Sequence, residues 1–118
     1  MAPNPVADFT PFDADLRLRR RSFSPVVFQF GGLDLTGYTA PIFRWGQNIA
    51  TGDPDGSVAG VLTPGANSVI QVTLDRSSFW TPLGSRDSGD WELGLLTPLG
   101  EPVGLVGGEF RVEGSFLP

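Results

Sequence analysis

The sequence of 118 residues lacks cysteine, histidine and lysine, so all eight of its basic residues are arginines. Without cysteine and histidine the chain can form no disulfide, no thiolate metal site and no nucleophile activated by an imidazole. Without lysine it can form neither a Schiff base nor the phosphate-binding loop that depends on a lysine. Catalysis would have to rest on carboxylates alone, and we expect neither an enzyme nor a bound cofactor or metal.

A pair of carboxylates, as in glycoside hydrolysis, is the catalytic arrangement that these absences leave open. Asp90 and Glu92 are two residues apart and would share one face of a strand, opposite Trp91 and Leu93. Because that face points to solvent, the two acids are better explained as surface charge on a sheet than as an acid–base pair.

The chain also lacks a basic excess and long apolar runs. Its net charge of −5 disfavours nucleic acid, whose phosphates need a basic face. No window approaches 18 apolar residues, and residues 1–5 lack the basic and apolar regions of a signal peptide. We expect no nucleic-acid partner and no membrane, and a chain made in a cytoplasm or packed into a particle assembled there.

Glycine and proline are abundant, with 16 and 11 copies placed between short apolar runs, and 40% of the residues are hydrophobic. This distribution predicts many short strands joined by turns in one domain. We expect an all-β fold, an immunoglobulin-like β-sandwich of about seven antiparallel strands. The predicted division is an extended N-terminal arm over 1–15, the sandwich domain over 16–113 and a C-terminal tail over 114–118.

The most tightly specified stretch is a corner between two strands. Glycines flank it, and Leu33 and Leu35 alternate so that both should point inward. The short polar side chains of Asp34 and Thr36 can bond nearby backbone N–H groups. We expect this corner to pass the chain from one sheet to the other, with the structural residues Asp34, Leu35, Thr36, Gly37 and Tyr38.

Four of the eight arginines fall in the alternating run over 16–23, which predicts a strand with arginine on its outward face. A solvated edge strand, whose charge prevents edge-to-edge aggregation, explains them without a partner. The functional interpretation is an acidic docking partner, such as the acidic arm of a neighbouring copy; nucleic acid is disfavoured because no aromatic residues interleave the arginines. The candidate interface residues are Arg17, Arg19, Arg20 and Arg21.

The two ends of the chain add further candidate interface residues. The arm over 1–15 has three prolines, three acids and two isolated aromatics, Phe9 and Phe12, and the tail ends in Phe116 and Leu117. A frayed terminus is the simpler explanation of the arm. Apolar side chains at both ends would also be explained by contacts with the chain's own domain or with a neighbouring subunit.

The remainder of the chain predicts a regular series of strands and turns. We expect strands over 57–62 and 69–74, and then one helical turn, with Asp75 as its N-cap, that buries Phe79 or Trp80. A hairpin should follow over 90–113, with a bulge or bend permitted at Gly107–Gly108.

Two binding functions have partial signals. The run Asp53-Pro54-Asp55-Gly56 contains part of a calcium-loop pattern, but position 62 holds a leucine where that pattern needs a glutamate, so a type I turn is the better interpretation. Exposed tryptophans could form a sugar-binding platform. The candidates are Trp45, Trp80 and Trp91. Trp91 alternates with core residues, which favours a packing position for it, and Trp45 is better explained as a core or rim filler.

The sequence resembles the N-terminal domain of bacteriophage baseplate upper proteins and related tail-fibre adaptors. The resemblance covers roughly residues 19 to 113, and its one sharp motif is Asp34-Leu35-Thr36-Gly37-Tyr38. Ser22 departs from the family pattern, which has a small turn residue and an acid there. The other matching runs are Arg21-Ser22-Phe23, Ile42-Phe43-Arg44, Gly89-Asp90-Trp91-Glu92-Leu93 and Gly108-Glu109-Phe110-Arg111-Val112.

This resemblance implies a structural protein of the virion that attaches parts of a tail, baseplate or fibre by non-covalent assembly. Its expected partners are other virion proteins and copies of itself in a symmetric homo-oligomer. Two alternatives stay open: a carbohydrate-binding or host-recognition module, which predicts exposed aromatics at one loop end, and a capsid decoration protein.

Overall fold

The structure is a computed structural model that describes residues 12–13, 15–20, 23, 25–47, 49 and 54–113. Several candidate interface residues, Phe9, Arg21, Phe116 and Leu117, lie outside the described residues, and Phe12 is described only in its backbone. The predicted contacts of the arm and the tail therefore stay predictions.

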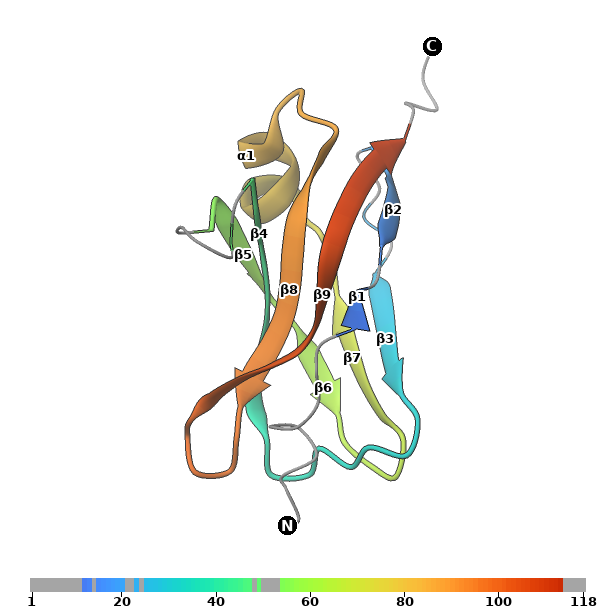
Figure 1. The fold of residues 1–118 in the computed structure, drawn as a ribbon, viewed down its shortest axis with the longest axis vertical. Helices are drawn as coiled ribbons and strands as arrows, with labels where there is room; N and C mark the ends of the chain where they lie inside the picture. Colours follow the sequence, from blue (N-terminus) through green and yellow to red (C-terminus); the bar gives the residue numbers. More distant parts are fainter. Residues whose placement is uncertain are drawn as a thin grey trace.

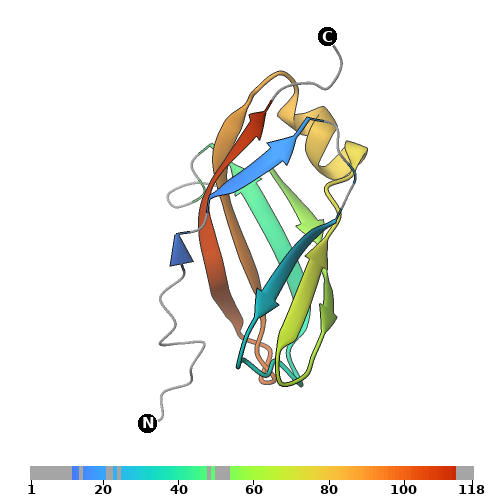
Figure 2. The same cartoon turned by 90° about the vertical axis from the view of Figure 1, so that its right-hand side faces the viewer.

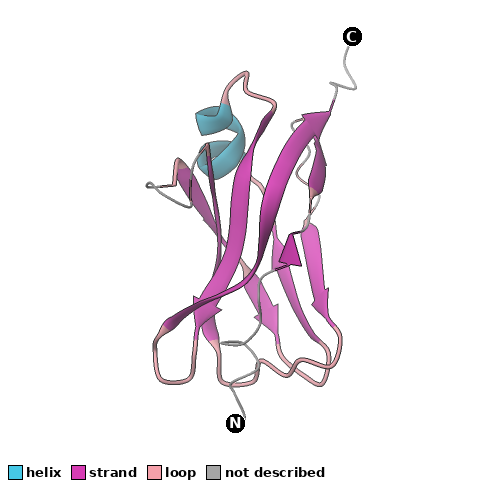
Figure 3. Ribbon diagram, viewed as in Figure 1, coloured by secondary structure: helices cyan, strands magenta, loops and turns pink. Residues whose placement is uncertain are grey.

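The described part of the chain is mostly β-structure, which confirms the predicted all-β class (Figures 1 and 3). Two sheets face each other around the core, and a short helical segment covers one end. The six-stranded sheet contains β1 (Phe12–Asp13), β2 (Leu16–Arg19), β4 (Thr39–Gly46), β5 (Gly56–Ala59), β8 (Ser88–Leu96) and β9 (Pro102–Glu113). The three-stranded sheet contains β3 (Val26–Phe30), β6 (Val61–Thr63) and β7 (Ser68–Val72). The helical segment is the π-helical turn η1 (Arg76–Trp80) followed by α1 (Thr81–Leu83).

The strand order is β1-β9-β8-β4-β5 in the larger sheet, where β2 also pairs with β9, and β3-β7-β6 in the smaller one. All of these ladders are antiparallel except those of β1 and β2, which run parallel to β9. The described residues thus form nine strands and not about seven, and two of them are not antiparallel. The alternating leucine–arginine run predicted the strand β2, but it did not predict that β2 would pair with β9. β1 also lies within the predicted arm.

The chain crosses between the sheets at Gly60, where the sequence had predicted one continuous strand over 57–62. β5 ends at Ala59 in the larger sheet, and β6 begins at Val61 in the smaller one. The Gly60 N–H donates to Pro41 O at 2.9 Å. A Cβ atom at residue 60 would lie 3.1 Å from Ile70 Cγ2, so the backbone at the crossing passes close to β7.

The β8–β9 hairpin has its irregularity at Leu105 and not at the predicted Gly107–Gly108. Leu93 pairs with Val106 and Gly94 pairs with Gly104, which leaves Leu105 as the extra residue of a bulge. Both Leu105 and Val106 are buried as a result. Gly107 and Gly108 pair in regular register with β8.

Aromatic side chains fill the part of the core that lies next to the helical segment. Trp45 and Trp91 are buried, Trp91 as its alternation with core residues predicted, and their indole N–H groups donate to Ser78 O and Glu109 O at 3.2 and 3.1 Å. Phe79 contacts four other rings, with centroid separations between 4.7 and 6.5 Å, those of Phe43, Trp45, Trp80 and Phe110. This cluster attaches the helical segment to the larger sheet.

Candidate functional site

The strand β2 carries the predicted arginines along one edge of the larger sheet. Leu18 is buried, whereas Arg17 and Arg19 are exposed, which is the alternation that the sequence predicted. Figure 2 shows β2 beside β9, extending toward the helical segment. Arg17 Nη1 lies 3.3 Å from Glu113 Oε2, but both side chains are more than half exposed, so this ion pair contributes little. The binding role of Arg17 and Arg19 stays a prediction.

Arg20 differs from the other candidate arginines because its guanidinium is bound within its own chain. Nη1 donates to Gly84 O at 3.2 Å and Nη2 donates to Arg86 O at 3.1 Å. These carbonyl groups follow the end of α1, where the backbone needs donors from elsewhere. Arg20 therefore joins the end of β2 to the helical segment, and its donors at these two carbonyls are not available to a partner.

The helical segment begins as the sequence predicted. The Asp75 carboxylate accepts a hydrogen bond from Ser78 N at 2.8 Å, and Phe79 and Trp80 are buried beneath the segment. Arg76, which the sequence did not single out, follows the cap and is exposed. Its guanidinium carbon lies 6.0 Å from the centroid of the Phe23 ring, within reach of a cation–π interaction.

A pocket of about 440 Å³ opens between the end of β2 and the helical segment. We call its described lining residues the basic end; they are Arg20, Phe23, Arg76, Trp80, Thr81 and Gly84. None of these residues is acidic, and Arg76 forms no ion pair within the described part of the chain. Phe23 is 48% exposed. The pocket therefore offers an apolar surface and a positive charge that pairs with no described acid.

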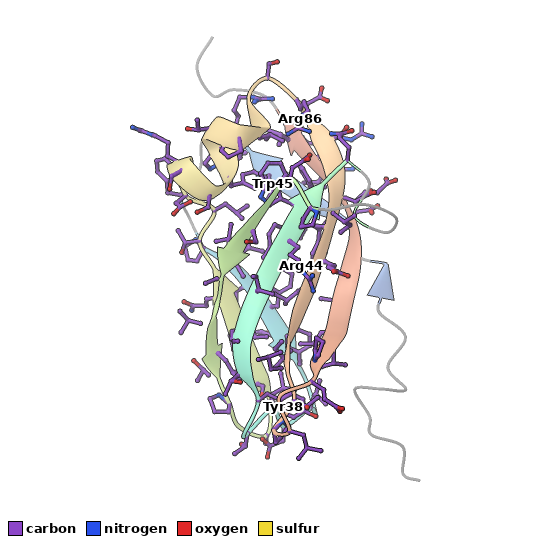
Figure 4. The ribbon with its side chains drawn as sticks, turned by 90° about the vertical axis from the view of Figure 1, so that its left-hand side faces the viewer. Tyr38, Arg44, Trp45 and Arg86 are labelled. Carbon is purple, nitrogen blue, oxygen red and sulfur yellow. The ribbon has the colours of Figure 1, made fainter. Side chains whose placement is uncertain are left out.

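Arg86 follows the helical segment in the chain, and its side chain binds that segment to the rest of the fold. Its Nη1 lies 2.9 Å from Asp55 Oδ2, and its other nitrogens donate to Pro82 O and Leu83 O, each at 3.2 Å. The guanidinium carbon lies 5.6 Å from the centroid of the Trp45 ring, and Figure 4 shows these two side chains at the end of the molecule opposite Tyr38. Arg86 thus links the loop before β5, the helical segment and the core.

The predicted corner forms the opposite end of the molecule and connects β3 to β4, which confirms that it passes the chain between the sheets. Asp34 Oδ1 accepts hydrogen bonds from the Thr36 hydroxyl at 2.6 Å and from Thr36 N at 2.9 Å. The hydroxyl bond first, and the N–H bond second, hold the pKa of the Asp34 carboxyl below its ordinary value. Leu35 is fully buried, and Gly37 has a φ of +90° that a glycine adopts without strain.

Three loops meet at this end, which we call the loop end: residues 31–38, 64–67 and 97–101. Gly32 N donates to Asn67 Oδ1 at 2.8 Å, which joins the first loop to the second. A Cβ atom at Gly37 would lie 3.3 Å from Pro98 Cγ, so the corner also touches the hairpin turn. The charged residues in these loops are Asp34 and Glu101, both acidic. Leu99, at the tip of the hairpin, is 87% exposed.

The acidic side chains of the larger sheet form no metal-binding group of three or more within the described residues. Glu92 lies 3.5 Å from Arg44 in a half-exposed ion pair, whereas Asp90 lines a second, polar pocket of about 470 Å³. That pocket mixes acids with Arg17 and Arg111. Asp90 and Glu92 are therefore placed in different charge environments.

Comparisons with protein-family models, with curated proteins and with solved structures find no match for this chain. Within the described residues, no helix has the length and apolar character needed to cross a membrane. The function has to be argued from the two ends and the faces of the molecule.

Proposed function

We propose that this chain is a structural component of a bacteriophage virion, a tail, baseplate or fibre-attachment adaptor that acts by non-covalent assembly. It carries its contacts on an immunoglobulin-like β-sandwich. The order β3-β7-β6 facing β9-β8-β4-β5 corresponds to strands B-E-D and G-F-C-C′ of that fold, which supports this assignment. The resemblance of the corner motif and the arginine strand to baseplate upper proteins supports the virion role.

The observation that carries the proposal is the basic end. Exposed Phe23 and Arg76 lie side by side over a pocket that, among the residues the structure describes, has no acidic lining residue and no ion pair to Arg76. Aromatic and arginine side chains dominate the binding energy of protein interfaces, where they fill desolvated pockets. A partner that supplies an apolar side chain next to a carboxylate would satisfy both features, and a protein segment carries that combination.

The outer face of the three-stranded sheet supports a role in assembly. Its cross-strand rows are Val27–Gln71–Val61 and Gln29–Val69–Thr63, with no charged residue in either row. Val27 is 47% and Val61 is 66% exposed. The outer face of the larger sheet carries the Arg44–Glu92 pair instead. Depletion of charge is typical of the central part of a protein interface, which favours this face as a second contact with other virion proteins.

The carbohydrate-binding alternative has less support from the structure. Trp45, Trp80 and Trp91 are buried, so none of them offers a flat ring to a sugar. The capsid decoration alternative uses the same surfaces and differs in where the protein lies in the particle.

Quantitative mass spectrometry of purified phage particles tests the proposal. We expect the wild-type chain to be present in several copies per particle and Arg76→Glu to lower its incorporation, because the reversed charge repels the partner's acid. The control Arg111→Glu makes the same charge change on exposed β9, outside the basic end, and should be incorporated normally. Circular dichroism should show both variants folded. Absence of the chain from the particles, or equal incorporation of the two variants, would overturn the proposal.

A further inference from the structure

The two ends of the molecule are complementary in apolar character and in charge. The basic end has an apolar pocket beside Arg76, and the loop end has an exposed Leu99 beside Glu101. We propose that the basic end of one copy receives the hairpin tip of a second copy, so that copies join head to tail. This inference rests on the proposed function, since it names the partner of the same pocket.

The hairpin tip is held in one conformation before any contact is made. Thr97 N donates to Glu101 O, and Gly100 N donates to Thr97 O, both at 2.8 Å. The Thr97 hydroxyl accepts further bonds from Leu99 N at 3.3 Å and Glu101 N at 3.2 Å. A tip that is already ordered loses little conformational entropy on binding. Leu99 is therefore a fixed apolar projection at the tip of a rigid loop.

The pocket matches this projection in chemistry. Phe23 and Trp80 supply apolar lining, and the pocket volume of about 440 Å³ lies in the usual range for ligand sites. Leu99 would occupy part of the pocket while Glu101, two residues along the chain, reaches Arg76. Glu101 forms no ion pair within the described part of the chain, so this contact breaks no existing pair there.

The positions of the two surfaces determine the kind of assembly. The molecule is 52 Å long, and the helical segment and the turn that joins β8 to β9 lie at opposite ends of that axis (Figure 1). A contact between different surfaces of identical copies is heterologous, and it leaves a free tip on one copy of the pair and a free pocket on the other. Such contacts build a ring if the rotation closes and a filament if it does not.

Cysteine cross-linking tests the contact directly, because the chain contains no cysteine of its own. We would introduce Pro98→Cys, next to Leu99, and Thr81→Cys, in the pocket lining, into the same chain, because both sites are exposed and the residues that make the proposed contact stay unchanged. A disulfide needs Cα atoms within roughly 7 Å, so the two new thiols can react only between copies. We expect mild oxidation in a glutathione buffer to give a ladder of oligomers on a non-reducing gel. The control pair Pro98→Cys with Ser57→Cys, whose second site is exposed on β5 outside the basic end, should give several-fold less product.

Charge reversal tests whether Glu101 of one copy contacts Arg76 of the next, with the rate of cross-linking as the measured quantity. In the chain that carries Pro98→Cys and Thr81→Cys, adding Glu101→Arg should slow the cross-linking by roughly 2- to 10-fold, the range expected for an exposed ion pair turned into a repulsion. Adding Arg76→Glu to the same chain should restore the rate, because the two charges are exchanged.

The outcomes separate this inference from the proposed function. Cross-linking no faster than in the control pair, or a double reversal that fails to restore the rate, would overturn the head-to-tail contact. If Arg76→Glu still blocked incorporation into particles, the proposed function would stand and the pocket would bind the acidic segment of another protein. Efficient cross-linking of a chain that is absent from particles would support the contact and overturn the virion role.

Discussion

Replacement of Ser68 by alanine tests whether the corner is held by hydrogen bonding from inside the fold. Ser68 is fully buried, and its hydroxyl accepts from Leu35 N at 2.9 Å and from Gly65 N at 3.3 Å. The same hydroxyl donates to Gly65 O at 3.1 Å. One side chain therefore connects the corner to the turn before β7, and no other partner of Leu35 N is seen in the described residues.

Ser68→Ala leaves the buried N–H of Leu35 without an acceptor. An unsatisfied buried donor costs about 1–3 kcal/mol, and loss of the second bond adds to that cost, so we expect roughly 2–3 kcal/mol less stability. This is a large share of the about 5–15 kcal/mol typical of a domain. For a chain of this length it corresponds to a fall in Tm of roughly 6–15 °C.

Urea unfolding followed by tryptophan fluorescence measures this loss, since the three tryptophans are buried in the folded chain. Ser57→Ala is the matched control, because Ser57 is exposed on β5 and should change stability by less than about 0.5 kcal/mol. Equal midpoints for the two variants would refute the view that Ser68 holds the corner.

Three further predictions follow from the core, the helical segment and the corner. Phe79→Ala should cost about 3–5 kcal/mol, because Phe79 is fully buried among four rings; calorimetry measures the loss, and a cost below about 1 kcal/mol would contradict the packing described. Asp75→Ala should cost about 0.5–2 kcal/mol by removing the cap on Ser78 N, whereas Asp75→Asn should retain most of the stability; equal effects in urea unfolding would argue against the cap. The lowered pKa of Asp34 means that its ionised form favours the folded state, so its contribution is present above the ordinary carboxyl pKa and lost as the pH falls through the lowered value. Stability measured between about pH 5 and pH 2 should therefore fall less steeply in Asp34→Asn than in the wild type, and parallel curves would be inconsistent with this linkage.

Local chemistry could be predicted well from the sequence. The Asp34–Thr36 bond and the Asp75 cap lie within three residues of their partners, so side-chain type and spacing were enough to identify them. The alternation that buries Trp91 and Leu93 was predicted for the same reason, because strand period is a local property.

Features that depend on distant parts of the chain were missed. The parallel pairing of β2 with β9 joins residues more than 90 positions apart, and no local pattern encodes the direction of a neighbouring strand. The crossing at Gly60 depends on close approach to Ile70, which the glycine alone does not reveal. Phe23 and Arg76 meet only in the folded chain, so the basic end was not visible in the sequence.

Electron cryo-microscopy of the intact phage particle tests the central claim most directly. We predict density for this two-sheet domain in several symmetric copies at the tail, baseplate or fibre attachment, with the pocket of Phe23 and Arg76 occupied by a protein segment that carries an acid. Particles without this density, or copies whose pocket faces solvent, would contradict the account.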